Sequence, residues 1–526
     1  MNALDFTVVA AYLVLMLGLG YFLRDQKNQG DFFLGGRSMG WLPLALSVMA
    51  TQLSAISFVS APGFVGLREG GGLTWLSYEF GVPLAMMALM LAVAPAVYRS
   101  AVISIYDLLE SRIGVSTRFL VSAAFQITRS FATGIMVYAM GLILEAVVGI
   151  PFWQSVAIIS VITIIYSLQG GMKAVVYTDA AQMVLIVLGL LACGYYAMSG
   201  LGGLGPALTA IDPARTEVIN FDRLGFSGDQ FGFWPMLLGG FVLYVSYYGA
   251  DQTQAQRVLS ARNLSEVRKL LLANGLLRFP VTLLYCLVGL AIGALVVRNP
   301  AVMAQIPPDR SDYMMPVFIL EYLPHGLIGL LVVAILAAAM SSLSGVINSL
   351  AAVTADDMAR LGFVPQNEKD AVARSRILAF AWGAIILAFS AFGGSIAPTV
   401  IEAINKVGSA LYGPVLATFL LALFRPGTRA LAANAGLVAG AALNLYLWRF
   451  APEVFWMWWN LIGLVATGVI GFGLDATLGH RRRHVALRDV SDAGGIGQAR
   501  AYSIVLAGYF GFIVLVSASL AFIAWG

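Results

Sequence analysis

Long runs of apolar residues, separated by short polar stretches, dominate this chain. Runs of about 20 residues match the length of a helix that crosses the hydrocarbon layer of a membrane. They occur at about 5–24, 41–66, 73–98, 117–148, 151–169, 176–199, 233–256, 271–298, 313–355, 375–394, 396–424, 429–448, 454–474 and 501–525. The pattern predicts an all-α polytopic membrane protein with about 14 transmembrane helices.

The composition supports a protein embedded in the lipid bilayer. Hydrophobic residues make up 60% of the 526 positions and charged residues 11%, and the mean hydropathy is +0.85. A soluble domain is roughly half apolar and about one quarter charged, so a globular enzyme with a single anchor is excluded. The first run lacks a basic flank and is expected to be a retained helix. Cys193 and Cys286 lie in apolar runs and predict no disulfide.

The basic residues indicate how the chain is oriented in the membrane. With the first residue outside, the loops that fall inside hold most of the arginines and lysines, including Arg481, Arg482 and Arg483. Cytoplasmic loops carry such an excess, so both termini are expected on the periplasmic side of a bacterial-type inner membrane. The net charge of +4 is spread over these loops and indicates no nucleic-acid partner.

A single arginine, Arg129, stands in the middle of the fourth apolar run. It lies eleven residues beyond Arg118, where the run begins, and therefore about 16 Å into a layer about 30 Å thick. A charge at this depth normally faces a water-filled cavity or an anion. No acid stands three or four residues away on the same helix. The partner is therefore a substrate carboxylate or an acid of another helix, such as Glu79 or Glu402.

Two of the runs are unusually polar in the middle. The second contains Thr51, Gln52, Ser54 and Ser57, and the seventh contains Gly249 and Asp251. Four runs separate the two, and interrupted helices at corresponding places in two halves indicate a transporter site near the middle of the membrane. The alternative is that the hydroxyls donate to carbonyls of their own helix.

Small and hydroxyl-bearing residues form a stripe along the ninth run. The stripe contains Ala338, Ser341, Ser342, Ser344, Gly345 and Asn348. Neighbouring hydroxyls suit a hard monovalent cation, which would also need backbone carbonyls from an unwound helix. Close packing of helices is the alternative explanation of such a stripe.

Other ionisable residues in the runs allow more than one role. Asp179 is the only acid of the sixth run, and it could bind a ligand or cap the start of a helix. Lys406 is expected to pair with Glu402, one helical turn away. Glu79 and Glu145 are given no role.

The sequence offers little support for an enzyme. It contains no P-loop, GxSxG or HExxH motif. His325, His480 and His484 fall in loops without metal-ligand spacing, and Ser341 and Ser342 have no nearby histidine to act as a base. A channel or a sensor on the same scaffold is the rival to a transporter.

Several segments resemble the sodium/solute symporter family. They are DFFLGGRSMGW, SVMATQLSAISF, QGGMKAVVYTDAAQ, DQTQAQRVLSARN and AAAMSSLSGVINS, and the match runs over about 5–425. The resemblance implies a LeuT-type fold, in which two inverted repeats of five helices follow one extra helix. The expected division is 1–40 for the extra helix and its loop, 41–199 and 233–424 for the repeats, 200–232 for an external loop and 425–526 for peripheral helices.

The resemblance also implies where sodium binds. The principal sodium site of the family corresponds to Ala50, Leu53, Ala338, Ser341 and Ser342, with backbone oxygens contributed by the first two. Some members hold a second sodium at positions that match Asp179, Ser341, Ser342 and Ser344. A further serine of that second site is Gly345 in this chain.

For the substrate, the nearest resemblance is to the bacterial sialic acid symporters. In these an arginine that matches Arg129 binds the carboxylate, and positions that match Ser54 and Ser57 contact the sugar. Gln52 stands where those proteins carry threonine and is expected to contact substrate too. We therefore expect a sodium-coupled symporter that imports a small organic solute with a carboxylate, of the sialic acid or monocarboxylate type, together with Na⁺. A neutral sugar or vitamin carrier of the same family is the alternative.

Overall fold

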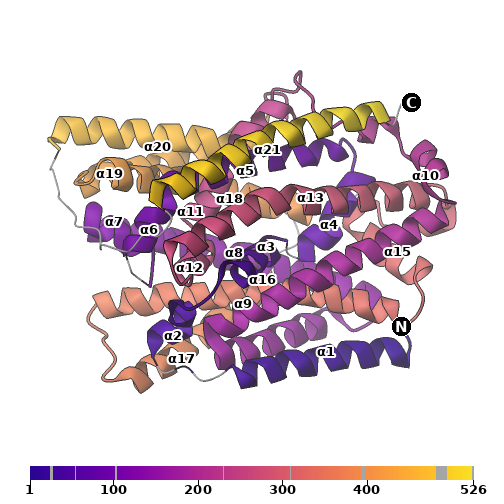
Figure 1. Cartoon of the computed structure of the whole chain (residues 1–526), viewed down its shortest axis with the longest axis horizontal. Coiled ribbons are helices and arrows are strands. Elements are labelled where there is room, and N and C mark those ends of the chain that lie inside the picture. Colours follow the sequence, from indigo (N-terminus) through magenta and orange to yellow (C-terminus); the bar gives the residue numbers. More distant parts are fainter. Residues whose placement is uncertain are drawn as a thin grey trace.

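The computed structural model describes residues 1–23, 26, 28–53, 55–100, 103–228, 230–308, 310–391, 399–480 and 495–523. Within these residues every regular element is a helix, apart from one isolated bridge between Met39 and Ala261. The long helices run side by side along one axis of the molecule (Figure 1). The predicted all-α class is therefore confirmed.

The helices follow one another in two halves of similar length. Up to residue 215 they are α1 (Ala3–Phe22), α2 (Gln29–Leu34), η1 (Gly35–Arg37), α3 (Trp41–Gln52), α4 (Ala55–Gly66), η2 (Leu73–Phe80), α5 (Gly81–Ala88), η3 (Leu89–Val93), α6 (Ala94–Ser100), α7 (Tyr106–Arg112), α8 (Val115–Val148), α9 (Phe152–Gly200), α10 (Leu204–Ala210) and η4 (Pro213–Arg215). After it come η5 (Pro235–Gly239), α11 (Gly240–Gly249), α12 (Gln252–Leu259), α13 (Leu264–Val297), α14 (Pro300–Met303), η6 (Ser311–Tyr313), α15 (Met314–Tyr322), α16 (Leu327–Arg360), α17 (Glu368–Ser390), α18 (Val400–Phe424), α19 (Ala430–Phe450), α20 (Trp456–Leu478) and α21 (Gly495–Ile523).

Helix α16 forms the centre of the bundle. Its most apolar stretch is 94% buried, whereas only 22% is buried in the corresponding stretches of α1, α20 and α21. A helix that is apolar on all sides needs protein or lipid around it, and α16 packs against α8, α9 and α17. The later helices α19 and α20 pack against α18, and α21 packs against α5 and α13.

Fewer helices than predicted are long and apolar enough to cross a membrane. The described residues contain 11 such helices, or 12 if the bent pair α3 and α4 counts as one span. The two remaining predicted runs also hold helices, but the apolar helix Phe152–Ile165 is short and η5, α11 and α12 are interrupted. The count of 14 is therefore not confirmed, because a run of apolar composition can hold a broken helix.

One predicted run is divided in the structure, and two others share one label. The single run at 313–355 is wrong, because α15 ends at Tyr322 and α16 begins only at Leu327. Between them lie Pro324, which has no amide hydrogen to donate, and Gly326, whose φ of +87° favours glycine. The runs at 151–169 and 176–199 remain two apolar helices, Phe152–Ile165 and Gly170–Gly200, which share the label α9 and are separated by the non-helical backbone of Gly171 (φ 53°, ψ −152°).

Two helices are interrupted where the sequence is polar. Helix α3 ends at Gln52, and its continuation in α4 is bent away by 53°. Helix α11 ends at Gly249, and α12 restarts after Asp251. Such breaks leave backbone carbonyls and amides without helical partners inside the bundle. These interrupted helices begin near the predicted starts of the two repeats, whose boundaries stay a prediction.

Both ends of the described chain lie at the same end of the bundle. The start of α1 and the end of α21 are together at the right of Figure 1, with α10 and α15. Helices α6 and α7 lie at the left. We call the right side the termini end and the left side the far end.

Candidate substrate cavity and cation site

A central cavity of about 120 Å³ lies at the break between α3 and α4. Its polar lining residues are Thr51, Gln52, Ser57, Tyr78, Arg129, Thr133, Tyr247, Arg278, Tyr285, Ser342, Asn405 and Tyr412. Three of the four predicted substrate contacts, Gln52, Ser57 and Arg129, thus line one cavity, while Ser54 lies outside the described residues.

The ionic partner of Arg129 comes from the break in the other interrupted helix. Arg129 Nη2 lies 3.4 Å from Asp251 Oδ2, and its Nε donates to Thr253 Oγ1 over 3.4 Å. The guanidinium carbon also lies 5.0 Å from the ring centre of Tyr247, which favours a cation through the ring quadrupole. An acid of another helix was among the expected partners, but it is Asp251 rather than Glu79 or Glu402.

A second, smaller cavity of about 40 Å³ adjoins the first. We call it the side cavity. Arg129, Ala132 and Tyr412 line both cavities, whereas Asp251 lines only the side cavity. The side cavity lies toward the far end, because it is also lined by Tyr106 of α7. Arg129 therefore stands between the two cavities.

Arg278 brings a second guanidinium to the wall of the central cavity. Its Nε lies 3.1 Å from both carboxylate oxygens of Glu79, and its Nη2 lies 3.1 Å from Glu79 Oε1. Tyr244 and Thr282 also donate to Glu79, over 2.9 and 3.0 Å. Both carboxylate oxygens of Glu79 therefore accept hydrogen bonds inside the bundle. Glu79, to which the sequence gave no role, holds Arg278 in place.

A further ion pair links the loop after α4 to α18. Arg68 donates to Glu402 through Nη2 at 2.7 Å and Nε at 3.0 Å, and its guanidinium lies 5.2 Å from the ring centre of Phe64. The predicted pair of Glu402 with Lys406 is therefore wrong. Lys406 instead lies 5.8 Å from the ring centre of Trp459, and the Glu402 carboxylate is already bound by Arg68.

This pair and the side cavity lie at opposite ends of the central cavity. Along α18, residues 401–405 line only the central cavity, Tyr412 lines both cavities, and Gly408, Leu411 and Val415 line only the side cavity. Along α8, residues 129–136 line the central cavity and residues 124–132 the side cavity. Glu402 is in the first turn of α18, so its pair with Arg68 is remote from the side cavity.

The residues of the predicted principal sodium site are all buried. The broken end of α3 brings Ala50 and Leu53, and α16 brings Ala338, Ser341 and Ser342. Ser342 Oγ donates to the carbonyl of Thr51 over 3.2 Å, so the hydroxyl stripe and the broken helix end are in contact. Carbonyls at a helix end have no amide partner in their own helix and are therefore suited to bind a cation.

Asp179 lies beside these residues and forms a fully buried ion pair. Arg257 Nη2 donates to Asp179 Oδ2 over 2.8 Å, with neither side chain exposed. Ser47 and Ser341 also donate to the carboxylate, over 2.5 and 2.6 Å. Asp179 is inside α9, eight residues after the kink at Gly171, so the alternative that it caps a helix start is wrong.

Ser344 of the predicted second sodium site, and Gly345 beside it, have other surroundings. Ser344 Oγ donates to the carbonyl of Ser341 over 3.0 Å instead of facing Asp179. A side chain at Gly345 would come within 2.8 Å of Arg257 Nη2. The missing serine side chain thus leaves the space that the guanidinium uses.

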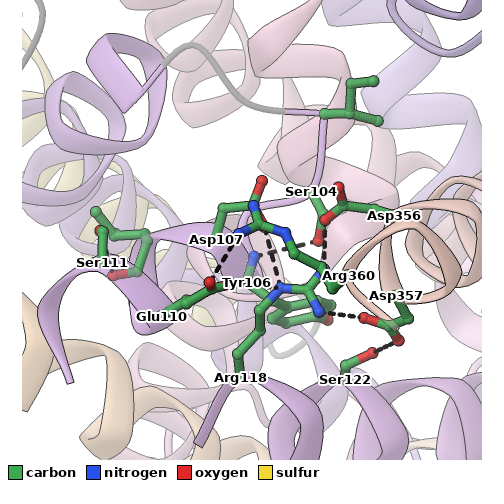
Figure 2. Close-up of polar contacts among 12 residues, drawn as sticks. Ser104, Tyr106, Asp107, Glu110, Ser111, Arg118, Ser122, Asp356, Asp357 and Arg360 are labelled. Atoms are coloured by element: carbon green, nitrogen blue, oxygen red, sulfur yellow. Dashed lines mark hydrogen bonds and ion pairs between the residues drawn. The ribbon is translucent and has the colours of Figure 1, made fainter. Parts of the chain in front are cut away.

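A network of charges joins three helices at the far end (Figure 2). Arg118 of α8 pairs with Asp107 of α7 at 3.0 Å and with Asp357 of α16 at 2.6 Å, and it also contacts Asp356. Arg360 pairs with Asp107 at 2.9 Å and with Glu110 at 2.7 Å. Burial and the neighbouring Asp356 raise the pKa of Asp107 to about 7. The acids outnumber the arginines, so a proton on Asp107 reduces repulsion.

Several residues of the site were missed in the sequence. Arg278 stands in the apolar run at 271–298, and the argument applied to Arg129 would have found it. Asp251 was noted only as part of a polar run. Arg257 and Ser47 carry no local signal, because their roles depend on contacts across the bundle. Neither Cys193 nor Cys286, both buried, is in a disulfide.

These features define a class of protein. An all-helical bundle with two interrupted helices around a buried polar cavity is the architecture of a secondary transporter. A family model described as "Sodium:solute symporter family" matches residues 32–440. The chain belongs to this family, whose members are sodium-coupled transporters and not enzymes.

Three relatives illustrate the family. Over 453 residues the chain is 29% identical to the human sodium/iodide cotransporter, covering 85% of this chain and 70% of that protein. It is 31% identical to the sodium-dependent multivitamin transporter of Oryctolagus cuniculus, with the same coverage of 85% and 70%. Identity to the human sodium-coupled monocarboxylate transporter 1 is 28%, covering 84% and 73%.

Solved structures confirm the LeuT-type fold. A substrate-bound, outward-open sodium-coupled sialic acid symporter superimposes with a TM-score of 0.82 at 21% identity, covering 91% of this chain and 99% of that chain. Mhp1, a nucleobase-cation-symport-1 family transporter, gives a TM-score of 0.56 at 13% identity, covering 89% and 97%.

Proposed function

We propose that this sodium-coupled symporter imports a small organic anion, and that the anion's carboxylate binds Arg129. The observation that carries the proposal is the guanidinium of Arg129 in the wall of the central cavity, whose ion pair is a long one. Its contacts to Asp251 and Thr253 are both 3.4 Å long. Charge-assisted hydrogen bonds are normally about 2.7–2.9 Å long, so Arg129 keeps capacity for a better acceptor.

The relatives are consistent with an anionic solute. Their names include an iodide cotransporter and a monocarboxylate transporter, and the solved sialic acid symporter shares the fold. Gln52 and Ser57 line the same cavity as Arg129 and would contact the remainder of the solute. Gln52 already accepts a hydrogen bond from Tyr248, which would hold its amide toward the solute.

Sodium would bind between the broken end of α3 and α16. We assign it to the carbonyls of Ala50 and Leu53 and to Ala338, Ser341 and Ser342. The contact of Ser342 with the Thr51 carbonyl supports this assignment, since the two groups lie within 3.2 Å. A second sodium at Asp179 is a weaker proposal, because Arg257 already neutralises that carboxylate.

In the proposed orientation the termini end is periplasmic and the far end is cytoplasmic. The loops rich in arginine and lysine support this orientation. Solute would enter past the pair of Arg68 and Glu402 and leave through the side cavity. Coupling requires that sodium and solute each favour the other's bound state, typically by about 1–3 kcal/mol.

The test is binding and uptake in proteoliposomes with a defined panel. We expect pyruvate, biotin or N-acetylneuraminate to accumulate against a gradient only when sodium is higher outside. The methyl ester of the same acid should bind at least about tenfold more weakly, a difference of about 1.4 kcal/mol. Equal binding of acid and ester would overturn the anion assignment, and current without accumulation would indicate a channel.

A neutral solute is the second candidate. Asp251 already gives Arg129 a counter-charge, so the cavity does not strictly require an anion. A neutral sugar or vitamin amide that accumulates with sodium, while the carboxylates do not, would favour this candidate.

A further inference from the structure

We propose that Asp251 is a resident counter-anion of Arg129, which the substrate carboxylate displaces, so that Asp251 sets both the affinity for anions and the closure of the side cavity. This inference rests on the proposed anion binding at Arg129. It adds a second residue, one that would compete with the substrate instead of binding it.

The backbone position of Asp251 makes its side chain a link between two helices. Ala250 is the C-cap of α11, and Asp251 is the N-cap of α12. One carboxylate oxygen, Oδ1, accepts from the amide of Thr253 over 2.7 Å. The other oxygen, Oδ2, is the one that faces Arg129. The cap can therefore persist when the contact to Arg129 is lost.

Among the ion pairs around the cavities, that of Arg129 is the loosest. Its closest nitrogen-to-oxygen contact with Asp251 is 3.4 Å. The pair of Arg257 and Asp179 is 2.8 Å long, and that of Arg68 and Glu402 is 2.7 Å long. Arg278 contacts both oxygens of Glu79 at 3.1 Å. A long single contact is the easiest of these to exchange for a bidentate one with another carboxylate.

Arg129 can be approached from two sides, by a solute carboxylate in the central cavity and by Asp251 in the side cavity. It lines the central cavity, where solute would bind, and the side cavity, where Asp251 is located. Its side chain is 12% exposed and that of Asp251 is 8% exposed, so a solute in the central cavity could approach the guanidinium directly. A solute carboxylate that binds Arg129 through two parallel hydrogen bonds would compete with Asp251 for the same N–H donors, and the more weakly held carboxylate would be displaced.

Displacement of Asp251 would loosen the barrier between the cavities. The residues shared by both cavities are Arg129, Ala132 and Tyr412. Once Arg129 turns to the solute, its contacts to Asp251 and Thr253 at the start of α12 are lost. A solute without a carboxylate would leave the contacts of Arg129 to Asp251 and Thr253 in place. Only an anionic solute in the central cavity would therefore free the start of α12.

The decisive variant is Asp251→Asn, because it is expected to increase the affinity for an anionic solute and not to reduce it. Asparagine caps a helix about as well as aspartate, so α12 keeps its start while Arg129 loses its counter-charge. Loss of one partner from a buried pair normally weakens a protein, but here an added anion should compensate. We expect pyruvate, biotin or N-acetylneuraminate to bind the variant at least about tenfold more tightly than the unaltered protein, measured as the shift in thermal unfolding with ligand concentration.

The control variant is Asp475→Asn. Asp475 is a fully buried partner of Arg425 at 2.7 Å and lines neither cavity. It should lower thermal stability without changing the affinity for any of the three acids.

If Asp251→Asn does not fold, the double variant Arg129→Gln with Asp251→Asn is used instead. Both residues of this neutral pair are uncharged, and the double variant should bind each acid and its methyl ester equally.

A second measurement uses chemical labelling to follow the opening of the barrier between the central cavity and the side cavity. Thr128 lines only the side cavity, and a cysteine there reports access of N-ethylmaleimide. Modification of Thr128→Cys should accelerate several-fold with the acid that binds, and it should be fast without any acid when Asp251→Asn is also present.

The proposal is overturned if none of the three acids binds Asp251→Asn more tightly than the unaltered protein, or if the neutral pair still prefers acid to ester. The two proposals fail in different ways. If the unaltered protein prefers acid to ester but Asp251→Asn does not bind more tightly, Arg129 binds anions and Asp251 is only structural. If the unaltered protein shows no preference, the proposed function itself fails.

Discussion

Arg257 and Asp179 form an ion pair from which solvent is wholly excluded, with 2.8 Å between Nη2 and Oδ2. The guanidinium also donates to Ser47 over 2.8 Å. It therefore lies where the resemblance to the family suggested a second sodium. Bringing two charges out of water is costly unless each is paired and hydrogen-bonded, and here each is. A fixed cation thus competes with sodium for the same carboxylate.

Gly345 is the position at which this competition can be tested. A side chain there would come within 2.8 Å of Arg257 Nη2, so Gly345→Ser should push the guanidinium from Asp179. We expect one sodium per solute in the unaltered protein, from reversal potentials in proteoliposomes, and a lower thermal stability in Gly345→Ser. A ratio of two sodium ions in the unaltered protein would contradict the view that Arg257 replaces the ion.

The paired hydroxyls of α16 should control the affinity for sodium. Ser341→Ala with Ser342→Ala removes two oxygens near the broken end of α3, and we expect the sodium concentration for half-maximal uptake to rise at least about tenfold. Ser349→Ala is a matched control, because Ser349 is buried on the same helix and donates only to the carbonyl of Gly345. Sodium dependence that is unchanged in the double variant would refute the assigned site.

Replacement of Arg129 by lysine should separate the contribution of its positive charge to anion binding from that of its two parallel hydrogen bonds. Lysine keeps the charge but cannot form two parallel hydrogen bonds to one carboxylate. We expect Arg129→Lys to weaken binding of an acid by at least about tenfold and to change binding of its methyl ester little. Arg425→Lys, at a pair outside both cavities, should leave both affinities as they are. Equal losses for acid and ester would mean that Arg129 has a structural role.

The charge network at the far end should make stability depend on pH. Burial raises the pKa of Asp107 to about 7 in the folded protein, whereas an unfolded aspartate has a pKa of about 3.9. Between these values the folded state binds the extra proton, so this residue makes the free energy of unfolding fall as pH rises from about 4 to about 7.

The measurement is the thermal unfolding midpoint in detergent from pH 5 to pH 8. Asp107→Asn keeps a polar side chain without a titrating proton, and the midpoint should decline less with pH than in the unaltered protein. Asp222→Asn, in an exposed loop, serves as the control. Parallel pH profiles for Asp107→Asn and the unaltered protein would show that the proton is held elsewhere.

The sequence by itself determined the helical fold, the polar interruptions and the presence of a buried cationic site. Each of these follows from local pattern. A long apolar run must form its hydrogen bonds internally in lipid, and a charge at the depth of Arg129 needs a cavity or a counter-ion. The same rule applied to Arg278 would have added the second guanidinium of the cavity.

Only the tertiary structure decided which charges meet. Arg68 and Glu402 are 334 positions apart, and Arg257 and Asp179 are 78 apart. No periodicity relates such residues, because their contact depends on how helices pack and where they break. Lys406 illustrates the difference, since spacing predicted a pair with Glu402 while packing gave Glu402 to Arg68. Spacing along one helix constrains a side chain weakly, whereas a buried carboxylate takes whichever cation the neighbouring helices bring to it.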